Sequence, residues 1–82
     1  MTITRKYDAD SHILYLSVGQ PRPAISVSLP LGVLVRSDKS TGEFVGVTFI
    51  DFEINRRSEY EKVLVNSHRV PEEILPRVLE NL

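Results

Sequence analysis

The 82-residue sequence predicts an α+β domain: an antiparallel β-meander of four to five short strands with a C-terminal helix packed on one face. Two observations support this class. Short alternating or β-branched runs, separated by Gly, Pro, Asp and Ser, recur up to residue 52. After that point apolar residues recur at helical spacing, and strands followed by helix are typical of α+β domains. We therefore expect a single domain over 1–82, with the β-sheet in 1–52 and a mainly helical part in 53–82.

The first two strands are predicted to form a hairpin. TITRKY (2–7) and HILYLSV (12–18) are rich in β-branched and aromatic residues. Between them, DADS (8–11) has turn composition, because Asp and Ser side chains bond nearby backbone groups.

A four-residue turn at this place fixes the pairing of the hairpin. The pairs expected to face each other are Tyr7 with His12, Arg5 with Leu14, and Ile3 with Leu16. The side chains expected to share the opposite face are Thr4, Ile13 and Tyr15.

Three more strands are expected before residue 53. They are AISVSL (24–29), VLVRS (33–37) and EFVGVTFIDF (43–52). The connections contain Pro, Gly or Asp and indicate loops or turns: GQPRP (19–23), PLG (30–32) and DKSTG (38–42). Gly46, inside the last strand, indicates a bulge or a close approach of backbone.

The C-terminal part favours helix. Ser58 and Glu61 fit a capping box, although VLV (63–65) would also suit a strand, so 58–66 is helix or strand. Pro76 does not suit a helix interior, so the last helix starts near it or is kinked there. The apolar stripe predicted for this helix consists of Ile74, Leu75, Val78, Leu79 and Leu82.

Composition excludes several classes of function. There are 10 Lys and Arg against 11 Asp and Glu, a net charge of −1, so we expect no nucleic-acid binding by the chain alone. The absence of cysteine excludes disulfides, thiolate catalysis and Cys-ligated zinc, and it favours a cytoplasmic protein. No apolar run approaches the roughly 20 residues of a membrane helix, so no membrane association is expected.

The acidic stretch after residue 7 raises the question of a metal site. Asp8, Asp10 and His12 offer three ligands, and Asp51 is the candidate from a neighbouring strand. The full calcium-loop spacing is absent, and a turn at 8–11 would disrupt a common ligand face, so a hairpin turn is favoured. No serine lies in a G-x-S-x-G elbow and no phosphate-binding loop is present. We therefore expect no enzyme activity, no metal and no cofactor.

Several strands are apolar on both faces, which predicts that both faces of the sheet are covered. The C-terminal helix covers one face, and a second subunit is the simplest cover for the other. This favours a homodimer over end strands that curl across the sheet. The residues expected to form the partner surface are Ile13, Tyr15, Leu34 and Phe44.

Two segments carry a resemblance to a known family. YDADSHILYL (7–16) and GVLVRSDKSTGEFVGVTFID (32–51) resemble the two halves of the Domain of Unknown Function 2283 family, over roughly residues 3–52. The matching residues are Tyr7-Asp8, Leu14-Tyr15-Leu16, Gly42, Val45-Gly46-Val47 and Ile50-Asp51. His12 and Thr48 stand where the family usually has Asp and Glu, which weakens the case for an acidic site here.

The resemblance implies a small bacterial protein without an established activity. Members that sit beside toxin-like partners imply an antitoxin-like role. Together, residues and resemblance predict a non-catalytic protein–protein interaction module, homodimeric and with a small protein as a further partner. The alternatives are an antitoxin-like regulator that neutralises a small partner protein, and a small metal- or ligand-binding protein.

Overall fold

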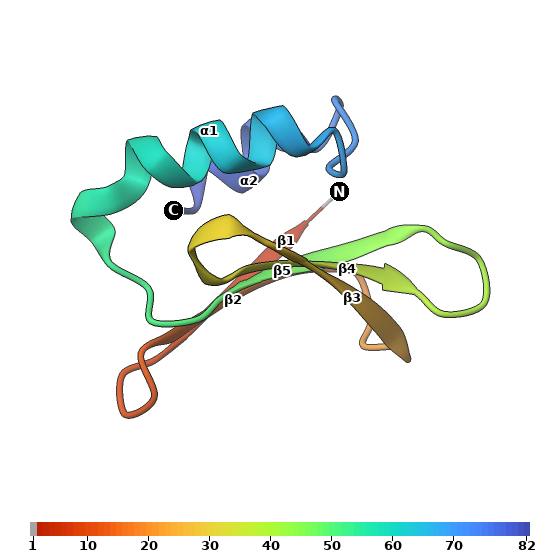
Figure 1. Ribbon diagram of the computed structural model, residues 1–82. Helices are drawn as coiled ribbons and strands as arrows, with labels where there is room; N and C mark the ends of the chain where they lie inside the picture. The colour runs from red at the N-terminus through yellow and green to blue at the C-terminus, as the bar shows by residue number, and fades with distance from the viewer. Residues whose placement is uncertain (1) are drawn as a thin grey trace.

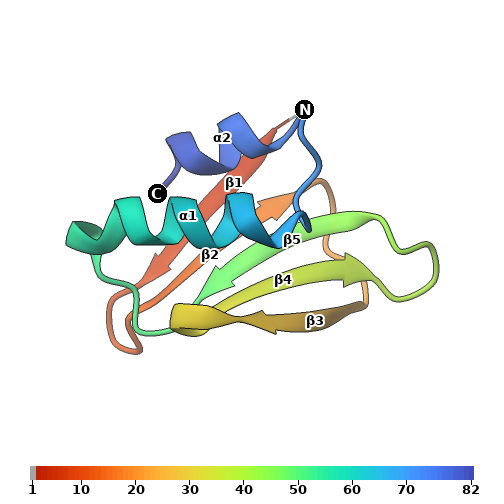
Figure 2. The same cartoon turned by 45° about the horizontal axis from the view of Figure 1, so that its top comes forward.

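The computed structural model describes residues 2–82 and confirms the α+β class (Figure 1). The strands are β1 (Ile3–Asp8), β2 (Ile13–Val18), β3 (Ala24–Leu29), β4 (Val33–Asp38) and β5 (Phe44–Phe49). The helices are α1 (Arg57–Ser67) and α2 (Leu75–Glu80), with short 3₁₀ turns η1 (Pro30–Gly32) and η2 (Ile54–Arg56). Both helices lie on one face of the sheet, and no helix of the described residues covers the other face (Figure 2).

Each of the five strands runs antiparallel to its neighbours, in the order β1-β2-β5-β4-β3. Consecutive strands pair within two units: β1–β2 is a hairpin, and β3–β4–β5 is a three-stranded meander. The β2–β5 pair joins the two units in the middle of the sheet. The connection from β2 to β3 therefore spans β5 and β4, and β1 and β3 are the two edges.

The first hairpin forms as expected, but its predicted pairing is wrong by two residues. Tyr7 pairs with Leu14 instead of His12, and the closing pair is Asp8 with Ile13. The turn lies one residue later because Asp8 remains in β1, while His12 adopts a left-handed φ of 57° in the turn. A shift of two residues preserves the alternation of faces, so Thr4 and its predicted companions still share one face.

The core lies between the sheet and the helices. It is built around side chains that are fully or almost fully buried: Leu14, Leu16, Val33, Val35, Val47, Phe49, Tyr60, Leu64 and Val78. Tyr60 of α1 is central, with its ring 5.2 Å from that of Phe49 and 5.4 Å from that of Phe52. Its hydroxyl accepts the backbone N–H of Glu53 at 3.1 Å, so the buried polar atom has a partner.

The segment 58–66 is helix, within α1, but the predicted capping box is wrong. Ser58 is the second residue of α1, and no side chain of residues 2–82 caps the helix. The reason is that η2 runs directly into α1, so that the Arg57 N–H donates to the Ile54 carbonyl. Arg56 instead binds Glu59 through two hydrogen bonds of 3.0 and 3.1 Å.

The second helix begins at Leu75 with Pro76 in its first turn, which confirms the first of the two alternatives for this proline. The predicted apolar stripe is confirmed: Ile74, Val78 and Leu82 are buried, and Leu75 and Leu79 pack against the core. Among residues 2–82, neither helix has the length and apolar character needed to cross a membrane.

Candidate functional site

The acidic stretch after β1 is a tight turn. The Oδ1 atom of Asp8 accepts the backbone N–H of Asp10 at 3.1 Å and that of Ser11 at 3.4 Å. Hydrogen bonds from the side chain and then the backbone of Ser11 hold the pKa of Asp8 below its ordinary value of 3.8. The Tyr7 hydroxyl lies 3.3 Å from Nδ1 of His12. These contacts confirm that a turn introduces the second strand.

The four metal candidates do not converge on one point. The backbone N–H of Phe52 donates to the His12 carbonyl at 2.8 Å, so the segment after β5 lies against the turn, and His12 and Asp51 line a shared surface hollow. Asp8 uses its carboxylate inside the turn, and Asp10 lies at the turn itself. Within residues 2–82 no three His, Asp or Glu side chains are grouped to hold a metal ion.

Three of the four residues expected on the partner surface share the face without helices. Ile13, Tyr15 and Leu34 alternate with the buried core positions of β2 and β4, so they lie on what we call the uncovered face. Phe44 does not share that face, because it packs against the core on the helix side. That this face binds a partner stays a prediction.

A β-bulge explains the position of Phe44. Arg36 pairs with Gly46, but the next residue, Ser37, pairs with Phe44, so Val45 is the extra residue of β5. Strict alternation back from the end of β5 would place Phe44 on the uncovered face, and the extra residue reverses this. A Cβ at Gly46 would also overlap the carbonyl oxygen of Leu16 on β2, so the predicted bulge and the predicted close approach are both present.

The uncovered face is organised in rows of side chains that lie opposite each other. One row runs across the sheet through Lys6, Tyr15, Thr48, Leu34 and Ser28. Thr48, at its centre, is only 6% exposed although no helix covers it. The row contains a cation, an aromatic ring and an aliphatic side chain, and it contains no carboxylate.

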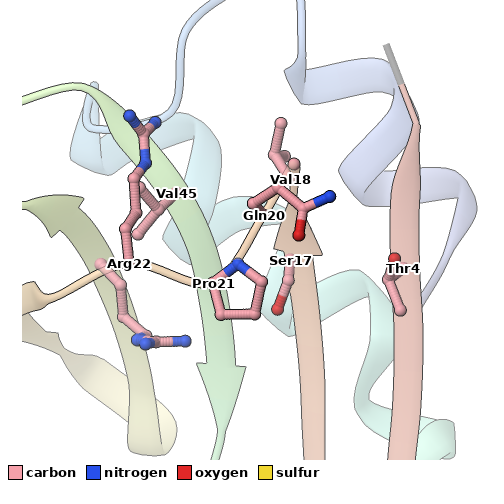
Figure 3. Close-up of a pocket in the computed structure, with 9 residues that line it drawn as sticks. Thr4, Ser17, Val18, Gln20, Pro21, Arg22 and Val45 are labelled. Carbon is pink, nitrogen blue, oxygen red and sulfur yellow. The ribbon is translucent and has the colours of Figure 1, made fainter.

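The neighbouring row contains a hollow. It runs through Thr4, Ser17, Gly46, Arg36 and Ser26, so small side chains and a glycine form its centre. The hollow has a volume of about 420 Å³. Figure 3 shows the Thr4 and Ser17 side chains on adjacent strands, with the loop of residues 19–23 passing across the sheet beside them.

The loop of residues 19–23, which we call the roof loop, is anchored to the β4–β5 turn. Arg22 Nη1 lies 3.2 Å from Oδ2 of Asp38 and 3.7 Å from Oε1 of Glu43. The backbone N–H of Lys39 donates to the Pro23 carbonyl at 3.0 Å. Both contacts hold the loop over the end of the sheet where the hollow lies.

Asp38 organises this turn. Its Oδ1 accepts the backbone N–H of Ser40 at 2.7 Å and that of Thr41 at 3.0 Å. The hydrogen bond from the Thr41 backbone is the largest of the effects that lower the pKa of Asp38 from its ordinary value of 3.8, and the Arg22 charge adds to them. The Asp38 carboxyl therefore stays ionised to a lower pH than an ordinary aspartate, and the ionised form binds Arg22 of the roof loop.

The side chain of Arg36, in contrast, has no hydrogen bond or ion pair with any of residues 2–82. The same holds for the side-chain hydroxyls of Thr4 and Ser17 and for the Gln20 amide. Four polar groups that line the hollow are thus available to a ligand.

The two edges of the sheet differ in charge. β1 carries Arg5, Lys6 and Asp8, and charged side chains are a common protection of an edge against pairing with another chain. β3 has the sequence AISVSL and carries no charge. Ile25 on this edge is 55% exposed. β3 is therefore the edge that is open to strand addition.

Sequence reasoning missed both the hollow and the uncharged edge strand β3. The signals are present in the sequence: Gly46 interrupts a predicted strand, and AISVSL alternates apolar and small side chains. Neither signal points to a site until the strand order places β3 at an edge and Gly46 between Ser17 and Arg36.

Comparison with known protein families, with curated proteins and with solved structures finds no match to this chain. The resemblance to the Domain of Unknown Function 2283 family stays a prediction.

Proposed function

We propose that this chain is a non-catalytic interaction module that assembles as a homodimer through β3. One observation carries the proposal: β3 is an uncharged edge strand whose pattern is symmetric about Val27. In the order Ile25, Ser26, Val27, Ser28, Leu29, apolar and hydroxyl side chains alternate identically in both directions.

This symmetry suits pairing with a second copy. In an antiparallel pair of identical strands around a two-fold axis at Val27, Val27 lies opposite Val27. Ile25 then lies opposite Leu29, and Ser26 lies opposite Ser28. Apolar side chains meet apolar ones on the helix side, and Ile25, which is 55% exposed in one chain, gains a cross-strand neighbour.

The arrangement has a consequence for the whole assembly. The two-fold axis that relates antiparallel edge strands is perpendicular to the sheet, so both helix layers lie on one side. The two uncovered faces then form one continuous surface on the other side. Pro23 and Pro30 flank β3 and limit the pairing to six residues, which favours a closed dimer over open-ended aggregation.

An edge-to-edge dimer is favoured over packing of two uncovered faces. The two central rows of that face contain Lys6 and Arg36 and no carboxylate. Two copies packed face to face would bury these positive charges near one another and away from water.

We also propose a cytoplasmic location, which the cysteine-free composition favours.

Native mass spectrometry of the untagged protein tests the proposal, supported by size-exclusion chromatography with light scattering. We expect a dimer for the wild type. Val27→Lys places two ammonium groups opposite each other at the axis, so it should yield a monomer with unchanged circular dichroism. Ile25→Lys should also yield a monomer. Because Ile25 is exposed in one chain, this change is less able to disturb folding and shows whether loss of the dimer is direct. Thr4→Lys on the β1 edge is the matched control and should remain dimeric.

Tyr15→Glu distinguishes the two dimer geometries. It changes the uncovered face, so it leaves an edge-to-edge dimer intact. A wild-type monomer at about 100 μM would refute the homodimer, since specific interfaces of ordinary size hold together below this concentration. A dimer that Tyr15→Glu dissociates and that both β3 variants retain would refute the assignment to β3.

A further inference from the structure

We infer that the hollow under the roof loop binds a monocarboxylate that carries a small apolar body. The juxtaposition that carries the inference is one cross-strand row on which Arg36, Ser17 and Thr4 all line the same hollow. The guanidinium and the two hydroxyls have no partner among residues 2–82, and the hollow also has an apolar side. The hollow is built within one chain, so the inference does not depend on the homodimer.

The register of the sheet explains why there is a hollow. Gly46 lies in the middle of its row, between Ser17 on β2 and Arg36 on β4. Because Gly46 has no side chain and Ser17 has a short one, the row leaves space beside Arg36. No larger residue fits at Gly46, since a Cβ there would overlap the Leu16 carbonyl oxygen. The packing of the sheet thus maintains the depth of the hollow.

The polar lining consists of groups that donate hydrogen bonds. Arg36 supplies a planar fork that matches the two oxygens of a carboxylate. Thr4 and Ser17, opposite each other on β1 and β2, supply hydroxyls, and Gln20 supplies an amide. None of the residues that line the hollow is Asp or Glu. An anion therefore meets donors and no competing carboxylate in the lining.

Charge decides between a carboxylate and a phosphate. Arg22 also lines the hollow, but it already has two anionic partners, Asp38 at 3.2 Å and Glu43 at 3.7 Å. Arg36 is the cation of the hollow that has no partner among residues 2–82. One uncompensated positive charge balances a monoanion, whereas a phosphate monoester carries close to two negative charges at neutral pH.

The remaining lining selects the body of the ligand. Pro21 and Val45 give the hollow an apolar side, and Figure 3 places Pro21 between Ser17 and Arg22. Val45 is only 6% exposed and is the extra residue of the bulge. A volume of about 420 Å³ lies in the range of small-molecule sites and exceeds what a bare carboxylate fills.

The test is a titration of the ¹⁵N-labelled protein followed by NMR, with hexanoate as the probe. Hexanol keeps the chain without the charge, and acetate and inorganic phosphate keep a charge without the chain. We expect saturable shifts with hexanoate at millimolar concentration, centred on residues 17–22 and 45–46. Hexanol, acetate and phosphate should each bind at least about tenfold more weakly.

Two variants assign the binding to Arg36. Arg36→Gln should weaken hexanoate binding about tenfold while the spectrum retains the wild-type dispersion. Arg69→Gln is the matched control, because the Arg69 side chain also has no partner among the described residues but does not line the hollow. It should leave binding unchanged. Equal binding by wild type and Arg36→Gln, equal binding of hexanol, or no saturation by about 50 mM would each overturn the inference.

Discussion

Replacement of Gly46 by alanine tests the structural account of the sheet most directly. Gly46 lies on β5 at the bulge and pairs with Ser17 of β2. An added Cβ would overlap the Leu16 carbonyl oxygen and lie 3.3 Å from the Ser17 Cα. Both neighbours belong to backbone that is held in the sheet, so no side-chain rotation relieves the contact. The two central strands must therefore move apart where they pair.

The expected cost follows from the rigidity of these neighbours. Overpacking of a filled interior typically costs about 1–3 kcal/mol, and a backbone obstacle places Gly46→Ala at the upper end, about 3 kcal/mol. A domain of this size has a free energy of unfolding of roughly 4–12 kcal/mol. The midpoint of thermal unfolding should therefore fall by about 12–24 °C.

Gly19→Ala is the matched control for this change. Gly19 has a positive φ of 71°, but no atom of the described part of the chain lies within 4 Å of the Cβ that alanine would add. This variant should lose only the conformational preference of glycine, about 1 kcal/mol. Urea unfolding followed by circular dichroism, at one fixed protein concentration, measures both. The reasoning fails if Gly46→Ala loses no more stability than Gly19→Ala.

Two further predictions concern the pH dependence of stability and a helix end. Because the folded-state pKa of Asp38 is lowered, its ionised carboxylate contributes stability that is complete above 3.8 and is lost as the pH falls through the lower folded value. Asp38→Asn should therefore flatten the fall of the urea midpoint below pH 4, and an equally steep fall in wild type and variant would contradict this. His68→Gly should stabilise by about 0.5–1 kcal/mol, because His68 ends α1 in a left-handed conformation with a φ of 54°, whereas Asn66→Gly inside α1 should destabilise. Thermal unfolding measures both glycine variants, and a lower midpoint for His68→Gly would contradict the prediction.

Local patterns predicted most of the elements because they depend on near neighbours in the sequence. Alternation in AISVSL and turn residues in DADS both report contacts within a few positions. The apolar stripe of 74–82 likewise identified the buried face of α2. The capping box at Ser58 failed because another local structure, η2, already supplies the start of α1.

The pairing of distant strands could not be predicted in the same way. Nothing near β2 in the sequence indicates that it pairs with β5, about thirty residues later, instead of with β3. Yet that pairing makes β3 an edge and places the roof loop across the sheet. Both proposed surfaces therefore depend on a contact that local reasoning does not reach.

The bulge at Val45 connects the core to the hollow. If β5 alternated strictly, Phe44 would lie on the uncovered face and Val45 would point toward the helices. The extra residue places Phe44 against the core and Val45 in the wall of the hollow, while Gly46, which has no side chain, lies between Ser17 and Arg36 of the lining. A single inserted residue thus adds a side chain to the helix side of the sheet and a wall to the hollow on the uncovered face. For this reason we expect sequence changes at 44–46 to alter both stability and carboxylate binding. Arg36→Gln should weaken carboxylate binding and leave stability unchanged.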